Sequence, residues 1–351
     1  MKKTIIYIYP TYSTFIKKDL DFLSENYNVK TPTEAFNKPS FLAIRFLKQF
    51  LFLIKNIKST KVVFVMFGGY WSFLPALFCK ITNKSCYIIL GGADCVSFPS
   101  INYGSLRKPF IKLFIKWSYQ LCTKLIPVDE SLVYNDYSYY ENSTYNKQGY
   151  KAFFPKIETP YKVIYNGFDT SFFESNLRKK SNSFILVASI PSMSTFKLKG
   201  VDIIFDLAKT YPNCTFTIVG LSADLSSKIT DKPSNITLYP FLSSNEFKKY
   251  LLETQFVLQL SISEGFPNAL CEAMLCNCIP IGSNVGAIPT IIKDTGYIIN
   301  SSNFNKIKSD FDEILQKSEE ENVLLAEKAR KRIVEEFPLS KRQEAFYQLI
   351  K

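Results

Sequence analysis

Short apolar runs alternate along the whole chain with segments of helical periodicity. In the first half, the apolar runs are too short for helices and rich in Ile, Val and Tyr, so they predict buried strands. The expected strands are Thr4–Tyr9, Lys61–Phe67, Cys86–Leu90, Leu125–Val128 and Lys162–Tyr165, and the expected helices are Ser40–Ile57, Trp71–Lys80 and Ser105–Thr123. The segment Tyr134–Gly149, rich in Asn, Ser and Tyr, is expected to be an irregular surface loop.

The second half repeats this alternation after a polar segment, Ser171–Ser183, that we expect to be a linker. The expected strands there are Phe184–Ser189, Thr215–Gly220, Ile236–Tyr239, Phe256–Gln259 and Ile279–Gly282, and the expected helices are Val201–Lys209, Ser244–Leu252 and Ala269–Leu275. A charged helical tail, Phe304–Lys351, is interrupted at Phe337-Pro338. The pattern predicts an α/β protein of two doubly wound, Rossmann-like parallel-sheet domains that face a central cleft. In such sheets a ligand lies beyond the carboxyl ends of the strands, which here places it between the domains.

Composition narrows the chemistry that this chain can perform. The 351 residues, 46% hydrophobic and 21% charged, have an ordinary globular balance and contain no histidine. The absence of histidine excludes Ser-His-Asp and Cys-His catalysis and HExxH zinc sites. The eight cysteines form no paired CxxC set, and the isolated Cys276-Asn-Cys278 predicts no metal site, so buried free thiols in a reducing cytosol are expected.

The chain contains no apolar run near the roughly 20 residues that a membrane span needs. The apolar stretch after Met1-Lys2-Lys3 is short and has no cleavage site, so we interpret it as a first buried strand rather than a signal peptide. We therefore expect the protein to be cytoplasmic, or peripheral on the inner face of the cell membrane.

Positive charge is concentrated in the first half. Residues 1–170 carry 22 Lys and Arg against 11 Asp and Glu, whereas residues 171–351 carry 21 against 20. A basic half indicates an anionic partner, which could be nucleic acid, acidic lipid headgroups or a phosphorylated substrate. The alternative is a solvated surface that only aids solubility.

The segment from Ser261 to Met274 carries the most informative chemistry. Glu264 follows a strand in a Gly/Pro turn, and Glu272 lies beyond it, after seven intervening residues, on a helix that starts near Asn268. Unpaired amides at such a helix start form an anion site, and two carboxylates beside it suit the hydroxyls of a nucleotide sugar. The alternative is an ordinary helix entry in which Asn268 caps the helix and Glu272 pairs with a lysine. The spacing alone leaves both interpretations open.

Four elements of the second half together resemble the family 4 retaining glycosyltransferases, which have the GT-B fold. They occur in the family's order over about residues 160–295, with weaker similarity at Gly68-Gly69 and Gly91-Gly-Ala-Asp94. The four elements are the Glu-x7-Glu segment, the following Ile279–Ile292, Lys199-Gly200-Val-Asp202 and Tyr165-Asn-Gly-Phe-Asp169.

The resemblance implies roles for individual residues. Glu264 would contact the hydroxyls of the donor sugar, Glu272 the ribose, and Lys199 the leaving diphosphate, without a divalent metal or other cofactor. The donor diphosphate would lie along Gly265, Phe266, Pro267, Asn268, Ala269 and Leu270. Retention would proceed by same-face attack, in which a phosphate oxygen takes the acceptor's proton and no protein base is needed.

The sequence also departs from the family's pattern. The usual Gly-Arg before the Lys-Gly element is missing, and Lys197 is the nearest cation that could replace its arginine. The histidine that many members place near the reacting sugar is absent, so we assign acceptor or sugar contact to Asp94, with a turn cap as the alternative. Asp19-Leu-Asp21 and Asp310-Phe-Asp312 resemble the metal-binding DxD of another glycosyltransferase fold, and we interpret both as solvated helix faces.

The basic helices of the first half suit the headgroup layer of an anionic membrane. Arg45, Lys48 and Lys55 share one face of an apolar helix, and Ser105–Lys124 combines four basic residues with Phe110, Phe114 and Trp117. The alternative is that the apolar faces pack on the sheet and the lysines are simply solvated. Nucleic acid is not favoured, because no helix-turn-helix, zinc finger or RNP motif is present.

The sequence therefore predicts a retaining, metal-independent GT-B glycosyltransferase. Residues 1–170 would bind the acceptor, residues 171–335 the nucleotide sugar, and residues 336–351 would form a helix crossing back to the first domain. The sugar would pass from a nucleoside diphosphate to a hydroxyl of a lipid-linked cell-surface polysaccharide precursor, of capsule or lipopolysaccharide. The alternative is a non-transferase GT-B protein, either a sugar-nucleotide epimerase or a silent binding protein.

Overall fold

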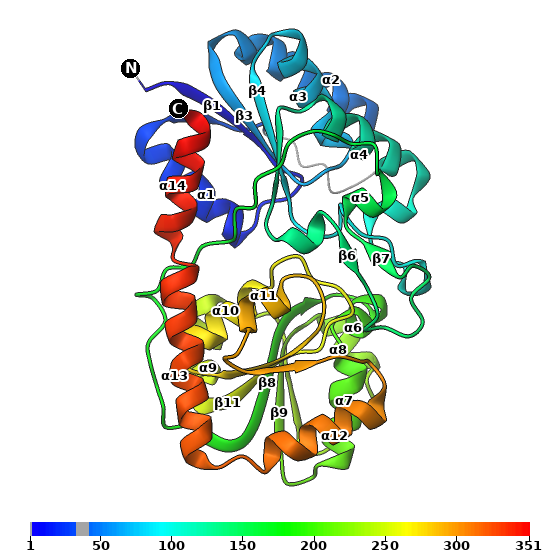
Figure 1. The fold of residues 1–351 in the computed structure, drawn as a ribbon, viewed down its shortest axis with the longest axis vertical. Helices are drawn as coiled ribbons and strands as arrows, with labels where there is room; N and C mark the ends of the chain where they lie inside the picture. Colours follow the sequence, from blue (N-terminus) through cyan, green and yellow to red (C-terminus); the bar gives the residue numbers. More distant parts are fainter. Residues whose placement is uncertain (1, 33–41) are drawn as a thin grey trace.

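The computed structural model describes residues 2–32 and 42–351, which form two α/β domains with parallel sheets (Figure 1). The first sheet has five parallel strands in the order β2-β1-β3-β4-β5, an order typical of doubly wound folds. Its strands are β1 (Thr4–Ile8), β2 (Asn28–Lys30), β3 (Thr60–Met66), β4 (Ser85–Leu90) and β5 (Lys124–Pro127). Strands β1, β3 and β4 are almost wholly buried because helices cover both faces of the sheet.

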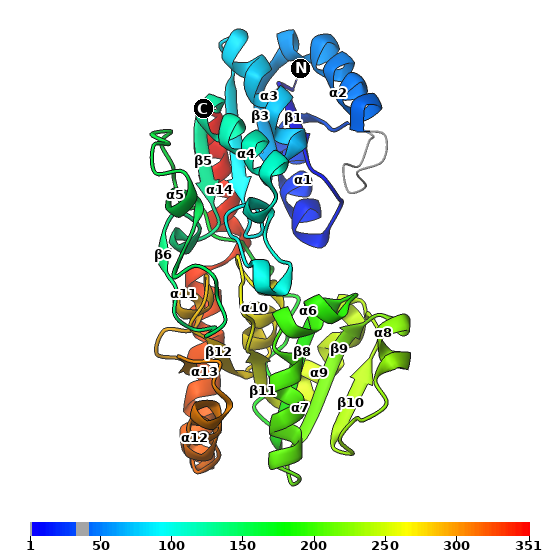
Figure 2. The ribbon, with the colours of Figure 1, turned by 90° about the vertical axis from the view of Figure 1, so that its right-hand side faces the viewer.

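Two groups of helices cover the first sheet. The N-terminal helix α1 (Thr14–Asn26) and the C-terminal helix α14 (Leu339–Ile350) lie together on one face. The other face carries α2 (Leu42–Asn56), α3 (Tyr70–Ile81) and α4 (Pro109–Leu121), which pack side by side (Figure 2). After β5 the chain forms a small ribbon, β6 (Asn135–Asp136) and β7 (Lys147–Gln148), and the short helix α5 (Tyr150–Phe153).

The second sheet has six parallel strands in the order β10-β9-β8-β11-β12-β13, the strand order of a dinucleotide-binding domain. Its strands are β8 (Lys180–Ile190), β9 (Thr215–Leu221), β10 (Ile236–Tyr239), β11 (Thr254–Gln259), β12 (Ile279–Ser283) and β13 (Tyr297–Ile299). The helices around it are α6 (Met193–Leu198), α7 (Val201–Thr210), α8 (Ala223–Lys228), α9 (Ser244–Glu253), α10 (Asn268–Leu275), α11 (Ile288–Ile292), α12 (Phe304–Leu315) and α13 (Glu319–Glu336). Phe184 at its centre stacks on Phe216 and Phe256 of the two neighbouring strands.

The predicted fold class is confirmed, with differences in several elements. Strand β2 was not expected, whereas α1 is the helix inferred around Asp19 and Asp21. The polar linker ends early because β8 begins at Lys180. The expected strand Lys162–Tyr165 is extended and bonds to β5 through the amides of Lys162 and Ile164, but it forms no strand of the sheet. The helix expected from Ser40 is described from Leu42, and its first two expected residues lie outside the described residues.

The tyrosine-rich segment after β5 is only in part the surface loop that we expected: residues 141–147 are mostly exposed, but three of its tyrosines are not. Tyr137, Tyr139 and Tyr140 are buried, and the first two donate hydrogen bonds to the second domain, at the carbonyls of Ile262 (2.7 Å) and Leu260 (3.5 Å). The expectation was wrong for these tyrosines because each ring is large enough to fill an interface while its hydroxyl satisfies a backbone carbonyl there.

Asp19 is not on a solvated helix face either. It is fully buried, and it accepts hydrogen bonds from Tyr7 and from Arg342 of α14. Asp21 is exposed and pairs with Lys17, as expected of a helix surface. Asp310 and Asp312 lie at the surface of α12, where Asp312 pairs with Lys308.

All eight cysteines are buried and free, as predicted. Among the described residues, no helix is both long and apolar enough to cross a lipid bilayer. No group of three potential ligands that could hold a metal ion occurs within residues 2–32 and 42–351.

Candidate active site

The predicted site lies where the strand order of the second sheet reverses. Strands β8 and β11 are neighbours in the sheet although β9 and β10 lie between them in the chain, and ligands bind at such switch points. Lys199 follows β8 by way of α6, and Glu264 follows β11 directly. The topology therefore brings together two residues that are 65 positions apart.

Glu264 and Lys199 form an ion pair of 2.6 Å between Nζ and Oε1. The same carboxylate oxygen accepts hydrogen bonds from Ser261 (2.7 Å) and Gln259 (2.9 Å). Among the hydrogen bonds of the described residues none ends at Oε2, so this oxygen is available to accept from a ligand hydroxyl. The Lys199 ammonium has three donors and uses one here, which leaves two for an anion.

The turn that carries Lys199 depends on the glycine after it. Gly200 has a φ of 68°, and a Cβ there would lie 2.2 Å from the carbonyl oxygen of Leu260. The amide of Ile262 also donates to the carbonyl of Leu198 (2.8 Å). The Lys-Gly turn therefore packs directly on the end of β11, and this contact sets the distance between Lys199 and Glu264.

Glu272 lies farther along α10, near the first domain. Burial raises the pKa of its carboxyl from 4.5 to about 7, and the ammonium of Lys18 in α1 opposes this rise. Lys18 also lies 5.0 Å over the ring of Phe168. The helix entry between the two glutamates packs tightly, with Gly265, Phe266, Pro267 and Leu270 buried.

The structure does not bring Lys197 to Glu264. Its side chain is exposed, and its ammonium lies 5.8 Å from the ring centre of Tyr140. The proposed replacement of the missing arginine by Lys197 stays a prediction.

Asp94 holds the loop after β4 in the first domain. Its Oδ2 accepts from the amide of Gly68 and the hydroxyl of Tyr119 (both 2.9 Å), and its Oδ1 accepts from the amides of Gly91 (3.2 Å) and Gly92 (3.0 Å). Burial raises the pKa of Asp94, while these hydrogen bonds oppose the rise. These hydrogen bonds are those of a turn cap, so Asp94 positions the loop by binding the loop's backbone amides.

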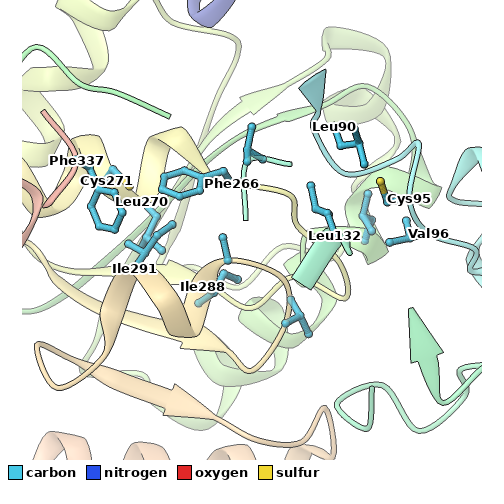
Figure 3. Packing of buried hydrophobic residues seen from close by; sticks show 14 of the residues in the cluster. Leu90, Cys95, Val96, Leu132, Phe266, Leu270, Cys271, Ile288, Ile291 and Phe337 are labelled. Atoms are coloured by element: carbon cyan, nitrogen blue, oxygen red, sulfur yellow. The ribbon is translucent and has the colours of Figure 1, made fainter. Parts of the chain in front are cut away.

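That loop touches the second domain backbone to backbone beside Glu264. A Cβ on Gly265 would lie 1.8 Å from the carbonyl oxygen of Gly91 and 3.1 Å from the Cα of Gly92. Close packing continues on both sides of this contact. Figure 3 shows Leu90, Cys95, Val96 and Leu132 of the first domain across from Phe266, Leu270 and Ile288 of the second.

Two functional candidates were not identified from the sequence. Burial raises the pKa of the Tyr103 hydroxyl, and the nearby carboxylates of Glu264 and Asp94 raise it further. Tyr137, which donates to Ile262, also lines a small pocket with Phe98, Gln148 and Glu264. The clustering of tyrosines after β5 was the available signal, and it was interpreted as a loop.

The family-model comparison identifies the domain that carries Glu264, Lys199 and Glu272. The model of "Glycosyl transferases group 1" matches residues 168–332. This segment is therefore similar to glycosyl transferases group 1. The predicted resemblance to glycosyltransferases is confirmed, whereas the assignment to family 4 stays a prediction.

One relative and two solved structures are also similar to this chain. The chain is 34% identical over 138 residues to the capsular polysaccharide biosynthesis glycosyltransferase CapH of Staphylococcus aureus. That match spans 38% of this chain and 38% of CapH, well under two thirds of the relative.

The chain is similar in fold to sucrose-phosphate synthase from Thermosynechococcus elongatus, with a TM-score of 0.77 and 12% identity over 99% of this chain and 98% of that one. A structure of HepE from Anabaena in complex with UDP and glucose has a TM-score of 0.69 and 14% identity over 99% of both chains. The chain thus has the GT-B fold.

Proposed function

We propose that this protein is a retaining, metal-independent glycosyltransferase that uses a nucleoside diphosphate sugar as its donor. The ion pair between Lys199 and Glu264, at the switch point of a group 1 domain, carries the proposal. This pair supports the proposal because its carboxylate would accept hydrogen bonds from sugar hydroxyls while its ammonium would bind the diphosphate.

The donor would lie along the segment from Gly265 to Leu270. The ribose hydroxyls would donate to the Glu272 carboxylate, whose ionised form accepts hydrogen bonds. The free Oε2 of Glu264 would accept from the sugar hydroxyls. HepE, whose fold this chain shares, binds UDP and glucose, which supports a donor of this class.

Transfer would proceed on one face of the sugar. The bond between the anomeric carbon and the diphosphate oxygen breaks, the acceptor oxygen bonds to that carbon from the same side, and the acceptor's proton passes to the departing phosphate oxygen. Lys199 neutralises the charge that develops on the diphosphate. The chain's absence of histidine is compatible with this reaction, because no protein base takes part.

The acceptor would be a lipid-linked precursor of a cell-surface polysaccharide at the cytoplasmic face of the membrane. The name of CapH, a capsular polysaccharide biosynthesis glycosyltransferase, supports a polysaccharide acceptor. Residues 1–170 would hold this acceptor across the cleft, with α14 completing their domain. Asp94 would act by positioning the Gly91-Gly92 loop against Gly265.

Thermal melting with UDP, GDP, ADP and their sugar conjugates, with and without EDTA, tests the donor site. A ligand at about 100 times its dissociation constant should stabilise the fold by about 2.7 kcal/mol. We expect one nucleotide to raise the melting temperature, with no change on adding EDTA. A rise that EDTA abolishes would contradict metal independence, and no rise with any nucleotide would contradict the donor site.

A further inference from the structure

The outer face of helices α2, α3 and α4 exposes many large apolar side chains, and we call it the apolar face. Phe110 is 77% exposed and Ile81 is 73% exposed, although both are of a kind that usually packs inside proteins. The remaining exposed members are Ile44, Leu47, Phe50, Leu51 and Ile54 of α2 and Leu113 and Trp117 of α4. Contiguous apolar surfaces of this kind mark interaction sites.

Aromatic contacts join the three helices into one surface. Phe46 of α2 and Phe73 of α3 each contact Phe114 of α4, with ring centres 5.8 Å and 5.5 Å apart. Phe73 also contacts Trp117 at 5.7 Å. These three helices lie side by side on the side of the domain turned toward the viewer in Figure 2. The exposed side chains therefore belong to one continuous face.

This face is almost free of acidic residues. From residue 42 to residue 128 the only acidic residue is Asp94, which is buried. The same stretch holds twelve basic residues: Arg45, Lys48, Lys55, Lys58, Lys61, Lys80, Lys84, Arg107, Lys108, Lys112, Lys116 and Lys124. Its partner must therefore be both apolar and anionic.

We propose that the apolar face docks onto the surface of an anionic lipid membrane. Aromatic and aliphatic side chains interleaved with lysines suit the boundary between headgroups and acyl chains. A second copy of the chain would bring like charges together, and nucleic acid would leave the exposed leucines and isoleucines without an apolar partner.

Helix α3 connects this face to the interdomain contact. It begins at Tyr70, directly after Gly68 and Gly69, and the Gly68 amide is held by Asp94 in the loop that touches Gly265. A helix of 12 residues is about 18 Å long. Membrane docking would therefore bring a lipid-linked acceptor to the domain whose loop contacts Gly265, next to Glu264. This placement rests on the proposed function, whereas the docking does not.

Vesicle binding tests the docking directly. The probes are vesicles of phosphatidylcholine alone and of phosphatidylcholine mixed with phosphatidylglycerol, used with the full chain in sedimentation. Both tryptophans, Trp71 and Trp117, lie on α3 and α4. We expect binding to the anionic vesicles, with a blue shift of tryptophan emission, and weakening of both by added salt. No binding to anionic vesicles would overturn the proposal.

A matched pair of variants locates the docking face. Phe110 and Phe241 are each 77% exposed, but Phe241 lies in the second domain. Phe110→Ser should weaken vesicle partitioning roughly tenfold, because an aromatic side chain no longer enters the interface. Phe241→Ser should leave it unchanged. Equal effects of the two variants would overturn the assignment to this face.

Charge variants provide a second readout. Lys108→Gln and Lys116→Gln should each weaken partitioning about fivefold at low salt, because each removes one positive charge near the headgroups. Lys328 is exposed on α13, away from the apolar face, and Lys328→Gln should leave partitioning unchanged. Self-association without vesicle binding, if Phe110→Ser abolishes it, would instead make this face an interface between copies.

The two proposals fail in different ways. Glu264→Ala should bind vesicles like the unaltered protein while losing transfer. If the unaltered protein binds vesicles but transfers no sugar from any donor, the proposed function is wrong and the docking stands. If it transfers sugar to a soluble acceptor but binds no vesicle, the docking is wrong and the function stands.

Discussion

The guanidinium of Arg342, in the last helix, forms a two-point ion pair with the carboxylate of Asp19, in the first helix. Both distances are 2.7 Å, both residues are buried, and 323 positions separate them. Arg342 also donates to the carbonyl of Tyr165 (3.0 Å), in the segment that leads from the first domain to the second. The pair therefore ties the end of the chain to its beginning.

Breaking this ion pair should lower the stability of the folded protein. Arg342→Ala leaves a buried, unpaired carboxylate, so we expect a loss of about 3–5 kcal/mol in the free energy of unfolding. Urea unfolding followed by tryptophan emission measures it, because Trp71 and Trp117 report on the first domain. The double variant Asp19→Leu with Arg342→Met leaves no buried charge and should be clearly more stable than Arg342→Ala. An equally unstable double variant would contradict the electrostatic explanation.

Removing either partner of the Lys199–Glu264 pair should abolish most transfer. Lys199→Ala and Glu264→Ala should each lower kcat by about a hundred- to a thousandfold, because each removes charge or hydrogen bonding at the reacting centre. Lys308→Met, which breaks a pair on the surface of α12, is the matched control and should leave kcat unchanged. Near-normal turnover in either site variant, with the fold intact by circular dichroism, would contradict these roles.

Gly265→Ala should open the interdomain contact. The added Cβ would lie 1.8 Å from the carbonyl oxygen of Gly91, so the domains must separate locally, and we expect kcat to fall more than stability does. Small-angle scattering should show a larger radius of gyration. Gly296→Ala is the comparison, since the atoms nearest its added Cβ belong to Pro280, inside the second domain. That variant should lower stability without changing the radius of gyration. A larger radius in Gly296→Ala but not in Gly265→Ala would contradict the role of Gly265 in the contact between the domains.

Glu272 should make stability and nucleotide binding depend on pH in opposite directions. Burial raises the pKa of its carboxyl in the fold from 4.5 to about 7, so the folded state binds the proton more tightly than the unfolded state. The stability that this group contributes is full below pH 4.5 and is lost as the pH rises through about 7. UDP affinity should instead rise through the same range, because in the proposed donor site the ionised carboxylate would accept hydrogen bonds from the ribose hydroxyls.

Glu272→Gln tests this dependence, because the amide does not titrate. In the variant, the fall in stability and the rise in UDP affinity near pH 7 should both flatten, as measured by thermal melting and calorimetric titration. Glu327→Gln, at an exposed position of α13, should keep both slopes. A variant whose affinity profile matches that of the unaltered protein would rule out Glu272 as the group responsible.

Much of the site could be predicted from local sequence. A parallel strand that ends in a turn before a helix places its loop at the edge of the sheet where ligands bind. Glu264 and Lys199 could therefore be named as candidates, and the structure brings them together, while their roles stay predictions. Asp94 was identified as a polar group at a strand end, but both its role as a turn cap and its sugar contact were compatible with the sequence. The four hydrogen bonds that it accepts favour the turn cap, and its contact with a sugar stays a prediction.

By itself, the sequence determined the alternation of strands and helices, the two doubly wound sheets and the position of the candidate site at one edge of the second. These features follow from the periodicity of apolar residues, which acts over a few neighbouring positions. Tertiary structure alone decided that Asp19 is buried against Arg342, that Tyr137 donates to the second domain, and that Gly265 meets Gly91. Each of these contacts depends on a partner more than a hundred positions away. The free energy of burying a polar side chain such as that of Asp19 depends on whether its partner is present, and the local sequence does not show that.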